Sequence, residues 1–270
     1  MRIRSAVVAL TVLLPAAATA QRSTDSAVSK WSDQIATGRW VRVSNLNGKI
    51  TVGQSTSGKV EVTSTKHWRR GNPDDVKIVA KKDGEDVVIC ALWGKQEDCE
   101  DRYDHNDRRH RSWNDWDNDD NDVYVDFAVL IPKGTKLRSS SVNGGQTITG
   151  ATSDVEASTV NGELRIDASG GGPVHGSGVN GRVYGRISGG TVDQPIDFST
   201  VNGSVVLEVP ENLGAEVTMT TVNGSLDSDF PLMVRGRIDP RHLTVHVGNA
   251  TNGPRVSLTT VNGSVELRKR

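Results

Sequence analysis

The sequence of 270 residues has few aromatic side chains, two cysteines and no excess of either charge. Aromatic residues make up 4% of the chain, and the formal net charge is -1. General nucleic-acid binding needs a basic surface, so this charge balance argues against that class. After the first twenty residues, no stretch is apolar enough to cross a membrane as a helix, and no window shows a helical period. The sequence therefore predicts neither a nucleic-acid-binding protein nor a helical membrane protein.

The first twenty residues have the features of a secretory signal peptide. Arg2 and Arg4 precede an apolar run at 6–14, and a small-x-small cleavage motif ends at Ala20. The run is short and no stop-transfer segment follows, so we expect cleavage rather than anchoring. The mature chain would start at Gln21 and be exported to the periplasm, the cell surface or the medium.

Cys90 and Cys99 are the two cysteines of the chain, and both remain in the mature protein. An exported protein reaches an oxidising compartment, which favours a disulfide bond between them. The bond would close a short loop at the end of a strand-like run at 86–90. The alternative is two free thiols, with Cys90 buried as a small hydrophobic side chain.

A Val-Asn-Gly tripeptide recurs at a spacing of about twenty residues, as expected for a repeat architecture. Serine or threonine usually precedes it, and a short alternating polar–apolar run follows it, which predicts strands. A copy at 45–48 opens the mature domain, and the last step is close to two periods with one degenerate copy between. The repeated corners are Asn143-Gly144, Asn161-Gly162, Asn180-Gly181, Asn202-Gly203, Asn223-Gly224 and Asn262-Gly263.

Two all-β architectures fit this repeat. Asn-Gly between alternating runs favours a type I′ hairpin, which would give an antiparallel β-sandwich. A single-stranded β-solenoid with one coil per repeat also accounts for the Val and the hydroxyl residue before each Asn. Equivalent side chains would then stack about 4.8 Å apart in successive coils. The solenoid, which we prefer, predicts an interior valine column, a hydrogen-bonded asparagine ladder and left-handed glycine corners.

The repeat and the signal peptide divide the chain into regions. We expect the signal peptide at 1–20, a lead-in at 21–38 and an N-terminal β region at 39–135. That region would complete or cap a repeat solenoid at 136–270, with 39–268 forming one continuous domain.

Val-Asn-Gly repeats behind a signal peptide resemble the bacterial putative-adhesin family, a domain of unknown function with a single-stranded β-helix. The segments at 131–137 and 209–215 also resemble the strand–Pro–turn–strand joints of that family. The resemblance covers about residues 39–268 and implies a fold but no activity. A long charged insert at 95–122 departs from the family pattern.

The insert at 95–122 is too polar to bury and should form an excursion between two strands. Four of its residues have the spacing of a calcium loop, which makes calcium a candidate ligand. They are Asp115, Asp117, Asp119 and Asn121. A calcium loop needs glycine at its sharp turn, where this chain has Asp120, so a solvated acidic loop is the alternative.

Trp113 and Trp116 lie in the same insert. Tryptophan combines a large apolar surface with one hydrogen-bond donor, which suits contact with a sugar or a protein partner. The alternative is that both rings only pack the loop against the domain.

The expected function is a non-catalytic binding or structural role in the cell envelope. Exposed Ser, Thr and Asn repeated over a long flat surface would suit an extracellular or envelope glycan or protein. We expect no cofactor other than calcium at the insert. The alternative is a polysaccharide-active β-helix enzyme, which needs paired carboxylates. Its candidates are Asp154, Asp167, Asp193, Asp197, Asp227 and Asp229.

Overall fold

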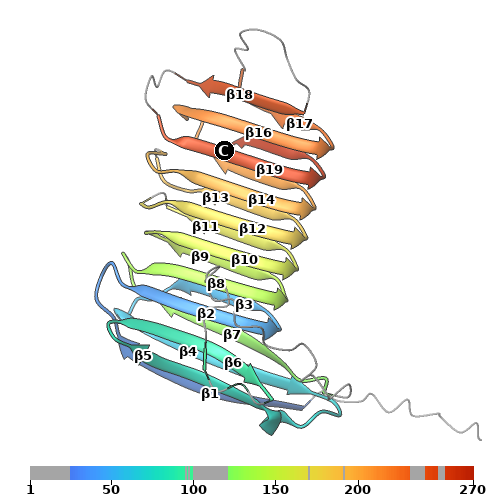
Figure 1. The fold of residues 1–270 in the computed structure, drawn as a ribbon. Coiled ribbons are helices and arrows are strands. Elements are labelled where there is room, and N and C mark those ends of the chain that lie inside the picture. Colours follow the sequence, from blue (N-terminus) through green and yellow to red (C-terminus); the bar gives the residue numbers. More distant parts are fainter. Residues whose placement is uncertain are drawn as a thin grey trace, which may run out of the picture.

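The computed structural model describes residues 25–94, 96, 98–99, 121–169, 171–190, 192–231, 241–248 and 253–270. These residues form two ten-stranded sheets, which we call sheet A and sheet B (Figure 1). The described ranges contain no α-helix, and one 3₁₀ turn, η1, spans Pro73–Asp75. The all-β prediction is confirmed.

Sheet A takes strands from the whole length of the chain. In spatial order they are β1 (Asp25–Gln34), β4 (Lys59–Trp68), β7 (Tyr124–Ile131), β3 (Ile50–Gln54), β9 (Gln146–Ala151), β11 (Leu164–Ala168), β13 (Val183–Ile187), β15 (Val205–Val209), β20 (Val265–Lys269) and β17 (Leu226–Ser228).

Sheet B lies opposite and is built in the same way. In spatial order its strands are β18 (His242–Val247), β16 (Ala215–Asn223), β19 (Arg255–Asn262), β14 (Ile196–Asn202), β12 (Val174–Asn180), β10 (Val155–Asn161), β8 (Lys136–Asn143), β2 (Trp40–Asn47), β6 (Asp86–Trp93) and β5 (Val76–Asp83).

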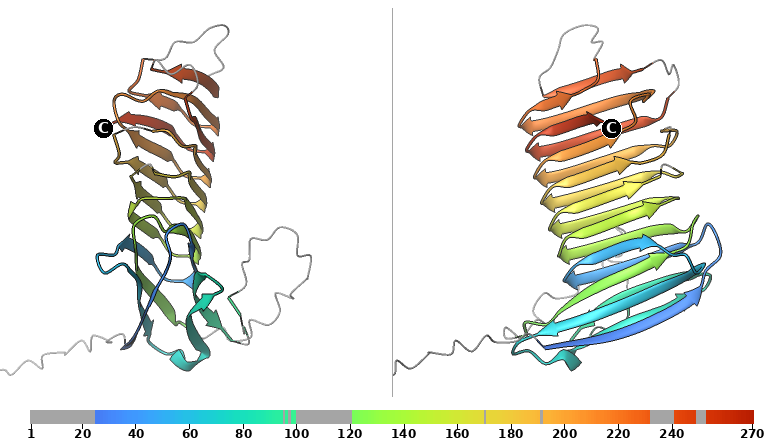
Figure 2. Two further views of the ribbon diagram at one scale, coloured as in Figure 1. Left: turned by 90° about the vertical axis from the view of Figure 1, so that its left-hand side faces the viewer. Right: turned by 180° about the vertical axis from the view of Figure 1, so that it is seen from behind.

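Each Asn-Gly pair of the repeat joins a strand of sheet B to a strand of sheet A. We call this strand–corner–strand unit a coil; β8–β9 and β10–β11 are two examples. Successive coils pair in parallel, and Figure 2 shows them stacked along one axis. The two strands that flank a corner belong to different sheets, so the corners are not hairpin tips. A type I′ turn also needs positive φ at Asn, and no described residue other than glycine has positive φ.

The coils do not stack in sequence order. The β19–β20 coil lies between the β14–β15 coil and the β16–β17 coil. The C-terminus therefore lies inside the stack rather than at its end (Figure 1). After β17 the chain returns through β18, which is antiparallel to β16. The long last step of the repeat is thus a return path, and the prediction of a degenerate copy there was wrong.

Both sheets continue from the repeat into the N-terminal region. On sheet A, β7 pairs in parallel with β3, whereas β4 is antiparallel to both β7 and β1. On sheet B, β6 is parallel to β2 and antiparallel to β5. The outermost strands at this end therefore run antiparallel to their neighbours, unlike the strands of the repeat.

The core is a narrow layer of aliphatic side chains between the sheets. Leu137, Val155, Val174 and Ile196 occupy matching positions on four neighbouring strands and are all buried. Burying one such side chain stabilises a fold by about 1.5–3 kcal/mol. Columns of this kind explain how a chain with few aromatic residues still builds a continuous core.

Phe198 is one of the few aromatic residues in this layer, and glycine makes room for it. A Cβ atom at Gly176 would lie 2.7 Å from Phe198 Cδ1. A Cβ atom at Gly185, on the opposite sheet, would lie 1.9 Å from Phe198 Cε2. The ring therefore fills space on both sheets that side chains occupy in other coils.

The valine of the repeat lies on the outer surface, so the predicted interior valine column was wrong. Val179, Val201, Val222 and Val261 are 38%, 40%, 49% and 37% exposed. The residue before each valine points inward instead, because side chains alternate along a strand. Thr200, which precedes Val201, is only 4% exposed.

The inward hydroxyls bind the corner of the neighbouring coil. Thr200 Oγ1 donates to the Gly181 carbonyl at 3.0 Å, and Thr260 Oγ1 donates to the Gly203 carbonyl at 2.8 Å. Thr159 makes the equivalent bond at 3.0 Å. Buried carbonyls need a donor, so these bonds explain why the repeat places a hydroxyl residue two positions before Asn.

Close stacking explains the glycine of each corner. A Cβ atom at Gly181 would lie 2.0 Å from the Gly162 carbonyl oxygen, and one at Gly203 would lie 2.1 Å from the Gly181 oxygen. The corner glycines Gly162, Gly181 and Gly203 have φ of 151°, 151° and 156°. L side chains rarely adopt such positive values of φ, so the left-handed corner that the repeat predicted is present at these coils. Glycine is needed at these corners both for this backbone conformation and because successive corners touch.

Candidate binding face

The outer face of sheet B carries an aligned row of hydroxyl side chains, here called the hydroxyl column. Each member lies three residues before the Asn of its coil, at half-buried or exposed positions. Strand spacing makes the column roughly 30 Å long. In spatial order its members are Ser44, Ser140, Ser158, Ser177, Ser199, Thr259 and Thr220.

A column of exposed and half-buried valines, called the valine column, runs beside the hydroxyl column, nearer to the corners. The residues that flank these valines are in register, so the valines are aligned as well. In spatial order they are Val142, Val160, Val179, Val201, Val261 and Val222. Apolar side chains in a continuous line on a surface indicate a contact site more often than scattered ones do.

Asparagine side chains form the ladder predicted at the corners. Six Nδ2 groups each donate to the Oδ1 of the adjacent Asn at 2.8–2.9 Å, and Asn47, at one end, accepts the first of these bonds. The prediction of a single asparagine column is confirmed, although its order follows the stack and not the sequence. The members are Asn47, Asn143, Asn161, Asn180, Asn202, Asn262 and Asn223.

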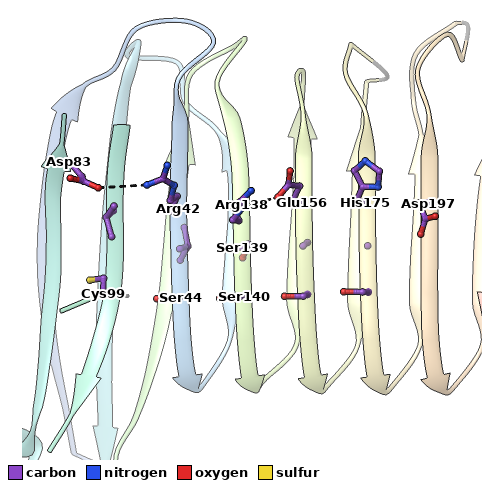
Figure 3. Close-up of a pocket in the computed structure, with 16 residues that line it drawn as sticks. Arg42, Ser44, Asp83, Cys99, Arg138, Ser139, Ser140, Glu156, His175 and Asp197 are labelled. Atoms are coloured by element: carbon purple, nitrogen blue, oxygen red, sulfur yellow. Dashed lines mark hydrogen bonds and ion pairs between the residues drawn. The ribbon is translucent and has the colours of Figure 1, made fainter. Parts of the chain in front are cut away.

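A shallow depression of about 570 Å³ lies on sheet B and extends from β5 to β14. Figure 3 shows charged side chains crossing it from strand to strand above the serines. Arg138 Nε lies 2.7 Å from Glu156 Oε2, and Arg42 Nη2 lies 3.0 Å from an oxygen of Asp86. His175 follows Glu156 on the next strand. The depression therefore combines both charges with hydroxyl groups.

The disulfide bond places the start of the insert beside this depression. Cys90 and Cys99 are joined, with an Sγ–Sγ distance of 1.98 Å, and Cys99 lines the depression. Trp113 and Trp116 lie outside the described residues.

The far end of the insert is fixed by Asp122. Its Oδ1 accepts the backbone N–H groups of Arg69, Arg70 and Gly71 at 3.1, 3.1 and 2.9 Å. These three bonds favour the charged carboxylate and lower the pKa of Asp122 to about 2. The residue ties the returning chain to the turn after β4.

Only one of the four calcium candidates lies in the described part of the chain. Asn121 Oδ1 accepts the Val123 N–H at 3.1 Å. The other three, Asp115, Asp117 and Asp119, fall outside the described residues. Within the described ranges, no group of three or more His, Cys, Asp or Glu side chains could hold a metal ion.

Most of the carboxylates considered for catalysis lie away from the depression. Asp154 pairs with Lys136 Nζ at 2.8 Å. Asp227 and Asp229 both contact Arg268 at 3.0 Å on sheet A. Bonds from Lys269 N–H and Arg268 lower the pKa of Asp229, which favours its charged form. Of the six candidates, Asp197 lines the depression.

The described residues include no helix long and apolar enough to cross a membrane. No protein-family model matches this chain, and no curated protein matches it in sequence.

The solved structures similar to this chain include two that are described as adhesion proteins. One is a "putative cell adhesion protein" from Clostridium sporogenes, 12% identical, with a TM-score of 0.51. The match covers 91% of this chain and 100% of that one. The other is a "putative adhesin" from Bacteroides fragilis, also 12% identical, covering 90% and 97% of the chains with a TM-score of 0.32. At this identity the first match shows a common fold, and the second score is too low to support an argument.

Proposed function

We propose that this protein is an exported, non-catalytic, adhesin-like protein of the cell envelope. It binds an extended glycan or protein along the outer face of sheet B. The observation that carries this proposal is the hydroxyl column beside the valine column. Hydroxyls both donate and accept hydrogen bonds, and valines supply apolar contact. Together they suit a ligand that is long, polar on its edges and apolar on its faces.

We further propose that the two sheets are the faces of a β-solenoid. The parallel, in-register coils and the asparagine ladder support this architecture. The signal-peptide features of the first twenty residues support export. The fold shared with a protein described as a "putative cell adhesion protein" supports an adhesin-like role.

A polysaccharide-active enzyme is the second candidate, favoured by the row of Glu156, His175 and Asp197 in the depression. Two strand spacings separate the two carboxylate-bearing strands, which is roughly 10 Å and close to the separation in inverting glycosidases. Glu156 Oε2 already lies 2.7 Å from Arg138 Nε, so this carboxylate is held in an ion pair with its neighbour instead of facing a substrate. The binding role therefore accounts better for the surface.

An array of glycans and envelope fractions tests this proposal with the intact mature protein. We expect a ligand to be retained and then released chemically unchanged. Retention of no glycan and no envelope component would contradict the binding role. Cleavage of a glycan that Glu156→Gln abolishes would instead establish the enzyme.

A second protein, with 101–120 replaced by a glycine–serine linker, tests the contribution of the insert. The replacement keeps Cys99 and Asp122, so the disulfide and the tie to the turn after β4 remain. Loss of binding would assign contacts to the replaced segment, which contains Trp113 and Trp116. Unchanged binding would confine the ligand to sheet B.

A further inference from the structure

The Asn-Gly corners are the places where this chain is most open to spontaneous deamidation. In that reaction the backbone nitrogen after Asn attacks the side-chain Cγ, and glycine offers the least hindrance because it has no side chain. The sequence contains eight Asn-Gly pairs. Seven are corners of the ladder, and Asn252-Gly253 includes a residue outside the described ranges.

Six of the seven corners hold the attacking nitrogen in a hydrogen bond. In each, the glycine N–H donates to the Asn carbonyl of the adjacent coil at 2.9–3.0 Å. A nitrogen held in this way cannot turn toward its own Asn side chain unless the coils separate. The six glycines are Gly48, Gly144, Gly162, Gly181, Gly203 and Gly263.

Gly224 is the exception because its coil is the last of the stack. Strand β18 covers β16 only as far as Thr220, with one further bond from Thr221 N–H to the Arg241 carbonyl. Beyond that point no described strand lies against the corner, and Val222 is the most exposed valine of its column at 49%. Among the described residues, the Gly224 N–H has no acceptor.

The Asn223 side chain is also held less firmly than those inside the ladder. An interior Asn such as Asn180 both donates to one neighbour and accepts from the other. Asn223 Nδ2 donates to Asn262 Oδ1 at 2.9 Å, and within the described chain its own Oδ1 accepts no bond. One hydrogen bond, rather than two, must break before Asn223 can rotate to expose Cγ.

We propose that Asn223 is a selective deamidation site of the folded protein. The Gly224 nitrogen loses its proton to base and bonds to Asn223 Cγ. The bond from Cγ to Nδ2 then breaks, and ammonia leaves. Water opens the resulting five-membered imide to give aspartate or isoaspartate. The net reaction consumes one water and releases one ammonia, with no change of oxidation state.

The modification would weaken the end of the ladder. A carboxylate at position 223 has no N–H to donate to Asn262 Oδ1, so two acceptors would face each other. The isoaspartate product also lengthens the backbone at a corner where stacked chains touch. A Cβ atom at Gly224 would lie 1.8 Å from the Gly263 carbonyl oxygen, which shows how little room exists.

Peptide mapping by mass spectrometry, after incubation of the full mature chain in mildly alkaline buffer, tests this proposal. We expect Asn223 to deamidate roughly tenfold or more faster than the six other corners, because those must first open locally. The same chain unfolded in urea should deamidate at all seven corners at similar rates. That control shows that folding, and not local sequence, creates the difference.

Two corners serve as internal controls. Asn47 lies at the opposite end of the ladder, but the Gly48 N–H is bonded to the Asn143 carbonyl at 2.9 Å. Asn262 is one coil inward from Asn223. If Asn47 or Asn262 reacts as fast as Asn223 in the folded protein, pairing of the glycine nitrogen does not set the rate and the proposal is wrong. Equal protection of all seven corners would also overturn it.

Discussion

The two outer faces of the stack differ, although the same coils build both. On sheet A, Arg268 contacts Asp227, Asp229 and Glu266, each at 3.0 Å. Tyr184 on the same sheet is 7% exposed and lies 4.1 Å beneath the Arg165 guanidinium. Burial and a bond to Glu208 raise the pKa of Tyr184. Sheet B instead carries the hydroxyl and valine columns.

The difference indicates which face is available to a ligand. The groups of the Arg268 cluster and of the Arg165–Tyr184 contact on sheet A satisfy one another, and such surface networks contribute modestly to stability. On sheet B the serines leave donors and acceptors for a ligand, beside apolar side chains that gain from burial. The repeat determines the backbone of both sheets, and the outward-facing side chains determine whether each face can bind a ligand.

The largest effect should come from the core on which both faces rest. Phe198→Ala removes a fully buried ring and should lower the free energy of unfolding by about 3–5 kcal/mol. Gly176 and Gly185 line the space and cannot fill it. Urea unfolding followed by circular dichroism measures the loss. A change below about 1 kcal/mol would mean that the ring is not the central packing element.

A smaller loss should follow a change at one corner. Gly181→Ala places a Cβ atom 2.0 Å from the Gly162 carbonyl and should cost about 1–3 kcal/mol. Gly58→Ala is the matched control, since Gly58 also has positive φ, at 73°, and a Cβ atom there meets nothing within 4 Å. Thermal unfolding compares the two variants. Equal melting temperatures would contradict the account of close-stacked corners.

The stability of the protein at acid pH should depend on Asp122, the carboxylate that holds the far end of the insert. Because the pKa of Asp122 is lowered to about 2, its stabilising effect is complete above its ordinary value of 3.8. That effect is lost as the pH falls through 3.8 toward 2. The variant Asp122→Asn should therefore be less stable than the parent at neutral pH, and the difference should shrink on acidification. Urea midpoints measured from neutral pH downward check this, and a constant difference would disprove it.

The smallest change in stability should come from the hydroxyl column. Ser177→Ala removes an exposed hydroxyl and should change the free energy of unfolding by less than about 0.5 kcal/mol. Thr200→Val, which removes the inward hydroxyl bonded to Gly181, should cost about 1 kcal/mol. Denaturant unfolding of both variants gives the comparison. A larger loss for Ser177→Ala would assign the outer hydroxyls a structural role.

The asparagine column could be predicted from the sequence because Asn-Gly recurs about every twenty residues within a similar local sequence. The outward orientation of the valines could also have been predicted. Side chains alternate along a strand, so Thr200 lies on the same face as the apolar Ile196 and Phe198, and Val201 lies on the opposite face. The sequence led us to expect an exposed surface of Ser, Thr and Asn, and applying that alternation would also have placed the outward hydroxyls in one column. The position of the β19–β20 coil between two earlier coils could not be predicted from the sequence. A segment that returns along the stack and a degenerate copy of the repeat would have similar numbers of residues.

The central claim is that a ligand binds the outer face of sheet B, and matched lysine pairs test it most directly. Ser158→Lys/Ser177→Lys places two cations in the hydroxyl column. Thr51→Lys/Thr147→Lys places the same charge on exposed, paired positions of sheet A. With the ligand found by the array, the sheet B pair should weaken binding by roughly tenfold or more, while the sheet A pair stays near the parent. Equal loss in both proteins, or loss confined to the sheet A pair, would contradict the account.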